Sequence, residues 1–275
     1  LPTAGYRALG QPTVGDINAD GIRDVIWAGG NKNGAQYVYV ASVCPGTVPN
    51  TVCGDAQPFD IIIDPLSFER VELLGSTCGG PAATAGNFLP DTGDEVLAVF
   101  GNSSCAAQAR LLRFDGEMRA TQVAQIPVGN DTATMLAATA RFDWFGDIDQ
   151  AVTVSEGLAV VGQNPTLLET RTVLSVIDFA SNGAMTAHQV MSLDGNIPIV
   201  RGLATGVFGP PPGGFDDPSD FVPQIAVMSI LAEATPSNVV EIYDVDPEAS
   251  YVPQLSSTHV LPSNFQVSNE CGPNY

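Results

Sequence analysis

Short segments of apolar residues, separated by Gly, Pro, Asn and Asp, cover most of the chain. Segments such as DVIWAG, EVLAVFG and QIAVMSI are rich in β-branched residues and end at glycine or acidic turns, which favours strands over helices. The segments that follow them, for example QYVYVA and VVEIYDV, mostly alternate between apolar and polar residues. No window shows the apolar stripe of an amphipathic helix. The pattern therefore predicts an all-β protein.

This pattern recurs along the chain as a repeat. The stretch GDINADGIRDVI around Asp16 aligns without a gap with GNFLPDTGDEVL around Asn87, and two weaker copies include Arg141 and Val207. Each unit has about 64 residues and contains a small-residue segment, an acidic turn, a short apolar segment and two alternating segments. Four strands per unit at near-constant spacing predict a β-propeller of four-stranded antiparallel blades, in which each sheet buries its faces against its neighbours. The expected blades are 1–76, 77–130, 131–196 and 197–262, and 263–275 is expected to start a further strand.

The first acidic turn has the spacing of a calcium-binding loop. Oxygen-bearing side chains at alternate positions can surround one point, Gly21 permits a sharp bend, and a last carboxylate closes the shell. The expected ligands are the side chains of Asp16, Asn18, Asp20 and Asp24 and the carbonyl oxygen of Ile22. These carboxylates would otherwise repel one another, which favours a Ca²⁺ site over the alternative of a solvated acidic turn.

The second turn keeps only part of this set. Asn87, Asp91 and Glu95 stand at positions 1, 5 and 9, whereas Leu89 replaces the ligand at position 3. A bound ion and an empty loop are equally compatible with these residues.

The third turn keeps Asp143 and Asp149 but has Arg141 and Phe145 where carboxylates would stand. We expect Arg141 to supply the positive charge that an ion supplies in the first turn. The fourth copy has lost the pattern, and its insertion PPPGGFDD is expected to be an exposed loop.

The turn Asp16-x-Asn18-x-Asp20-Gly21-x-x-Asp24, followed by an apolar strand and recurring once per unit, resembles the FG-GAP (VCBS, integrin-α-type) β-propeller repeat. The resemblance covers nearly the whole chain as a repeat, with the first copy as its strongest match. It implies a propeller that usually closes with seven blades, so that four blades would be part of a larger propeller completed by further domains or subunits. Four-bladed closure is the alternative.

Charge narrows the range of partners. The chain has 30 Asp and Glu against 10 Lys and Arg, a formal net charge of −20. This charge repels phosphate backbones and anionic lipid but attracts divalent cations, so neither nucleic acid nor an acidic membrane surface is an expected partner. No stretch approaches the roughly 18 apolar residues of a membrane span, so membrane insertion is not expected.

The five cysteines suggest a cellular compartment. They include no CxxC pair or metal-binding spacing, and two disulfides, Cys44–Cys53 and Cys78–Cys105, are predicted. This pairing indicates an extracellular protein and leaves Cys271 unpaired, which suggests a partner outside the chain. Buried free thiols in the cytosol are the alternative.

The sequence offers little for catalysis. His188 and His259 are the only histidines, and neither a GxSxG nor an HExxH motif occurs. Trp27 and Trp144 could stack on sugars, although packing between blades is the commoner role. We therefore expect a non-catalytic adhesion, protein-interaction or scaffold module that binds a protein or glycan. A carbohydrate-binding or polysaccharide-active portion of an enzyme and a structural subunit of a surface layer or appendage are the alternatives.

Overall fold

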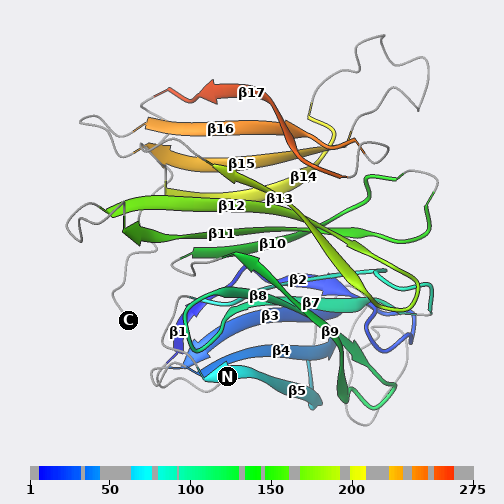
Figure 1. Ribbon diagram of the computed structural model, residues 1–275. Coiled ribbons are helices and arrows are strands. Elements are labelled where there is room, and N and C mark those ends of the chain that lie inside the picture. Colours follow the sequence, from blue (N-terminus) through cyan, green and yellow to red (C-terminus); the bar gives the residue numbers. More distant parts are fainter. Residues whose placement is uncertain are drawn as a thin grey trace.

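The computed structural model contains four antiparallel β-sheets, which confirms the prediction of an all-β protein (Figure 1). The structure describes residues 6–31, 35–43, 63–75, 80–91, 93–129, 134–143, 146–160, 168–192, 199–208, 223–231, 237–246 and 251–262. Over these ranges there is no helix, and hence none long and apolar enough to cross a membrane.

Each sheet is formed by strands that follow one another in the sequence. Three sheets have the four strands predicted from the repeat, whereas the first has a fifth strand that the sequence did not predict. The first sheet contains β1 (Tyr6–Leu9), β2 (Thr13–Gly15), β3 (Asp24–Asn31), β4 (Ala35–Val43) and β5 (Ile63–Gly75), with both β1 and β2 paired to β3. The second contains β6 (Ala82–Gly86), β7 (Glu95–Gly101), β8 (Ala107–Phe114) and β9 (Ala120–Gly129). The third contains β10 (Thr134–Ala140), β11 (Gln150–Val160), β12 (Leu168–Phe179) and β13 (Met185–Ser192). The fourth contains β14 (Ile199–Gly206), β15 (Gln224–Leu231), β16 (Ser237–Asp244) and β17 (Gln254–Val260).

The hydrophobic core lies between successive sheets. One cluster joins the first and second sheets, another the second and third, and another the third and fourth. Strand β7 shows the consequence, because Val96, Ala98 and Phe100 face the first sheet while Leu97 and Val99 face the third. A strand that is buried on both faces needs apolar residues at every position, which explains its continuous apolar sequence.

The first strands of the repeats, β2, β6, β10 and β14, follow one another through the stack, and each contacts the next. A cavity of about 340 Å³ is lined by residues from all four strands, among them Thr13, Ala85, Ala138 and Leu203. Hydroxyl groups join neighbouring strands, since Thr139 Oγ1 donates to the carbonyl of Ala85 at 2.6 Å and Thr205 Oγ1 to that of Thr139 at 2.6 Å. The turns that follow these four strands therefore lie next to one another along one edge of the stack.

Candidate functional site

All four turns end in the same hydrogen bond. The first residue of β3, β7, β11 and β15, here called the loop-closing residue, accepts from the backbone amide at the second position of its turn. These bonds are Ile17 N to Asp24 Oδ2 at 3.2 Å, Phe88 N to Glu95 Oε2 at 3.1 Å, Phe142 N to Gln150 Oε1 at 3.0 Å and Phe208 N to Gln224 Oε1 at 3.0 Å. The fold thus requires an acceptor at this place but not a charge.

This geometry corrects the alignment of the third turn. Gln150, and not Asp149, occupies the place of Asp24, because the third turn is one residue longer than the first. Sequence comparison missed Gln150 because it looked for a carboxylate. A polar acceptor at the first position of the strand that follows each turn was the available signal.

The first turn gathers three of its predicted ligands around one bend. Asp16 accepts from the amides of Asp20 and Gly21, both at 3.0 Å. Asn18 Oδ1 accepts from the same Asp20 amide at 3.1 Å, and Asp20 Oδ1 accepts from the amide of Ile22 at 2.8 Å. Gly21 makes the bend with a φ of +84°. The side chains of Asp16, Asn18 and Asp20 therefore surround one backbone turn, and their role as Ca²⁺ ligands stays a prediction.

Asp24 is the remaining side-chain ligand predicted for this turn. It is fully buried, and its Oδ2 accepts from the amide of Ile17. Among the residues that the structure describes, no three His, Cys, Asp or Glu side chains are grouped so as to hold a metal ion. The donor set still fits Ca²⁺ chemically, because it consists of carboxylate, amide and carbonyl oxygens. The carboxylate oxygens of Asp16 and Asp20 that accept amide hydrogen bonds each keep a second lone pair with which they could bind an ion.

Two further carboxylates, which we call inter-sheet carboxylates, connect the second turn to the first and the third turn to the second. Asp94 Oδ2 accepts from the amide of Asp16 at 2.9 Å, and the amide of Asp94 donates to the carbonyl of Asp16 at 2.7 Å. Asp149 makes the same pair with Asn87, at 3.1 Å and 2.8 Å. Sequence analysis did not assign this role to either residue. Both stand immediately before a loop-closing residue.

Close approach of the inter-sheet carboxylates requires glycine in the facing strand. A Cβ on Gly15 would lie 3.0 Å from Asp94 Oδ2 and 2.8 Å from the Cβ of Ala85. A Cβ on Gly86 would lie 3.2 Å from Asp149 Oδ2 and 2.6 Å from a methyl group of Thr139. The small residue before each of these turns is therefore a steric requirement of the contact between sheets.

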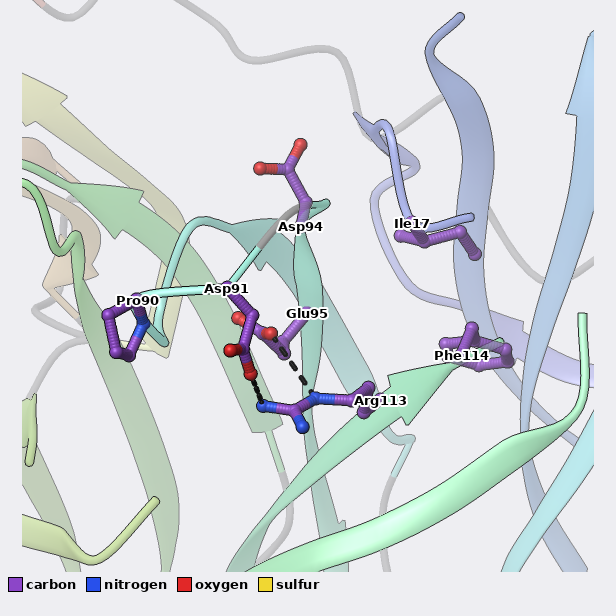
Figure 2. Close-up of a pocket in the computed structure, with 7 residues that line it drawn as sticks. All are labelled: Ile17, Pro90, Asp91, Asp94, Glu95, Arg113 and Phe114. Carbon is purple, nitrogen blue, oxygen red and sulfur yellow. Dashed lines mark ion pairs between the residues drawn. The ribbon is translucent and has the colours of Figure 1, made fainter. Parts of the chain in front are cut away.

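In the second turn, Arg113 stands between two of the three candidate ligands. Its guanidinium forms an ion pair with Asp91 and approaches Glu95, with Nε 3.7 Å from Oε1 (Figure 2). Asn87 points elsewhere, because its Nδ2 donates to the carbonyl of Asp147 in the third turn at 2.6 Å. The structure thus brings Asp91 and Glu95 together and separates Asn87 from them.

Glu95 is 2% exposed, and burial raises its pKa to about 7. Hydrogen bonds from the amides of Leu89 and Phe88, together with the charge of Arg113, oppose this shift only in part. The carboxyl group lies on an open cavity of about 590 Å³ between the first and second turns. The cavity is lined by Ile17, Pro90, Asp91, Asp94, Glu95, Arg113 and Phe114 (Figure 2).

Arg141 pairs with a carboxylate in the third turn, as predicted. Its Nε and one terminal nitrogen both lie 2.8 Å from Asp149 Oδ1. The guanidinium therefore neutralises the inter-sheet carboxylate of its own turn. Asp143 lies in this turn as well, whereas Phe145 and the insertion of the fourth copy lie outside the described residues.

Of the five cysteines, Cys105 is within the described residues and is disulfide-bonded. It lies in the turn between β7 and β8, with a φ of +63°. The other cysteines, Cys44, Cys53, Cys78 and Cys271, lie outside the described residues. Both predicted pairings therefore stay predictions.

The described histidines and tryptophan contact neighbouring side chains. His259 Nε2 lies 3.0 Å from Ser257 Oγ on the exposed strand β17, and the ring of His188 lies 5.8 Å from that of Tyr251. Trp27 stacks on Tyr39 of the neighbouring strand, with ring centroids 5.4 Å apart. Trp144 lies outside the described residues. His188 and Trp27 thus pack against aromatic rings, and His259 lies within hydrogen-bond distance of a hydroxyl group.

The fold and its turns define the class of this chain as an all-β repeat protein of successive antiparallel sheets. No protein-family model and no curated protein matches the sequence. Function is therefore inferred from the repeated sheets and from the residues of their turns.

Proposed function

We propose that the protein is an extracellular, calcium-binding β-propeller of the FG-GAP/VCBS type that acts as an adhesion, protein-interaction or scaffold module. The observation that carries this proposal is the repeat of one arrangement in four sheets. Each sheet packs on the next, the strands β2, β6, β10 and β14 follow one another, and each is followed by a turn with the same loop-closing hydrogen bond. Propeller blades pack in this way around a shared axis.

Calcium is assigned to the first turn, with Asp16, Asn18, Asp20, Asp24 and the Ile22 carbonyl as its ligands. The second and third turns carry arginines on their carboxylates, Arg113 and Arg141. The first turn offers oxygen ligands of the kind that Ca²⁺ prefers, within a chain of net charge −20. The extracellular assignment is supported by the disulfide at Cys105, since disulfides persist in oxidising compartments.

We expect Ca²⁺ to raise the melting temperature of the parent protein relative to EDTA, and Asp20→Asn to lose most of that rise. Asparagine keeps the acceptor for the Ile22 amide but removes a charge from the ion's shell. An ion at about a hundred times its dissociation constant stabilises a folded protein by about 2.7 kcal/mol. Thermal unfolding with and without calcium measures the effect.

Asp115→Asn is the matched control for this experiment. Asp115 is an exposed turn residue whose Oδ1 accepts from the amides of Glu117 and Arg119, both at 2.9 Å, so it has the same kind of role away from the first turn. This variant should keep the full calcium effect. Identical melting of the parent in calcium and in EDTA would contradict the assignment.

The binding role is tested with a glycan array, together with a turnover assay on the same polysaccharides. Saturable binding without turnover supports a binding module. Turnover would replace the proposal by its alternative, a polysaccharide-active enzyme portion. Fold alone does not decide between them, because one fold can carry many functions.

A further inference from the structure

We propose that Arg113 is the built-in cation of the second acidic turn, and that its guanidinium replaces a metal ion between Asp91 and Glu95. These two residues stand where the first turn has Asp20 and Asp24. The comparison between the turns rests on the proposed calcium site, whereas the pairing of Arg113 does not. The second turn then needs no divalent cation.

The strand register places the guanidinium. Arg113 follows Leu112, which pairs with Val96, so it lies opposite Glu95 on the neighbouring strand. Its side chain is 44% exposed and reaches Asp91, which is 54% exposed, with one nitrogen while Nε faces Glu95 (Figure 2). A planar guanidinium can serve two carboxylates in this way because it presents several donors in fixed directions.

The two oxygens of Glu95 have separate tasks. Oε2 accepts from the amides of Phe88 and Leu89, at 3.1 Å and 3.0 Å, and so closes the turn. Oε1 faces Arg113. The nearby Asp94 uses its Oδ2 for the amide of Asp16. Arg113 therefore meets the carboxylate oxygen that closure of the turn leaves available.

The same cross-strand position is matched to the loop-closing residue in the fourth sheet. There Gln224 pairs in register with Asp244, and its Nε2 donates to Asp244 Oδ1 at 2.7 Å. In the third sheet the amide of Gln150 is used within its own turn, because its Nε2 donates to the carbonyl of Ile148 at 3.1 Å. The neutral amide of Gln224 thus faces a carboxylate, whereas the carboxylate of Glu95 faces an arginine.

A double-mutant cycle in EDTA at pH 8 tests the pairing without calcium. Arg113→Gln should lower the folding equilibrium constant about tenfold in the parent, but less than about threefold in the Asp91→Asn/Glu95→Gln background. Arg113→Lys should restore part of the loss because it keeps a cation. Arg119→Gln is the control, since Arg119 pairs with Glu117 and both are exposed, and it should change the constant less than about twofold.

Equal losses in the two backgrounds would overturn the proposal. If Arg113→Gln does not fold, Arg113→Leu, which also removes the positive charge, takes its place in the cycle. A second readout uses calcium: Asp91→Asn should keep the calcium-induced rise in melting temperature of the parent, and a smaller rise would show that the second turn binds the ion. Failure of the calcium site itself would appear as no rise in the parent, and the cycle in EDTA would still decide the role of Arg113.

Discussion

Replacement of Phe88 by alanine is expected to lower the free energy of unfolding by about 3–5 kcal/mol. Phe88 is fully buried in the cluster between the second and third sheets, where its ring stacks on Phe179 with centroids 4.6 Å apart. Truncation removes this contact and leaves a cavity that neighbouring strands cannot fill without moving. Urea denaturation, followed by two spectroscopic probes, measures the loss.

Phe208→Ala is the matched control. Phe208 occupies the same place in the fourth turn, and its amide makes the same loop-closing hydrogen bond, to Gln224. It is 46% exposed, so its truncation should cost about 1 kcal/mol or less. A similar loss for both variants would show that burial between the sheets is not the source of the stability assigned to Phe88.

The strands and sheets were predictable from the sequence because the same order of segments recurs along the chain. The apolar segments of β7 and β11 follow small-residue strands and acidic turns in the same order, and each sheet is built from consecutive strands. Because each strand pairs with a strand close to it in the sequence, the order of the segments alone predicts which strands form each sheet. The continuous burial of β7 on both faces agrees with the prediction that sheets stack on their neighbours.

The contacts of the turns were less predictable, because they depend on register and on residues of other sheets. Arg113 reaches Glu95 through strand pairing and not through proximity in the sequence. Asp94 and Asp149 bind turns that lie 78 and 62 residues earlier. A search for carboxylates at fixed spacing finds neither relation, and it overlooks Gln150, since a neutral acceptor performs the same task there.

Glu95 should make stability fall as the pH rises. Its folded pKa of about 7 lies above the ordinary value of 4.5, mainly because burial disfavours the charged form. A raised folded pKa contributes stability that is complete below pH 4.5 and is lost as the pH rises through about 7. The shift corresponds to about 3 kcal/mol. The charged groups facing this carboxyl are Arg113, which lowers the pKa, and Asp91, which raises it.

Glu95→Gln should remove this pH dependence and make the protein more stable than the parent above pH 7, by up to about 3 kcal/mol. Glutamine can keep the hydrogen bond to the Phe88 amide, as Gln150 and Gln224 do in their own turns, and Arg113 retains Asp91. Free energies of unfolding at pH 5 and pH 8 measure the difference. The reciprocal variant Gln150→Glu places a carboxylate in the buried position opposite Asp178, and it should gain a pH dependence of the same sign. Parallel pH profiles for the parent and Glu95→Gln would mean that this carboxyl does not titrate in the physiological range. A Glu95→Gln variant no more stable than the parent at pH 8 would mean that a neutral acceptor at the loop-closing position confers no advantage over a charged one.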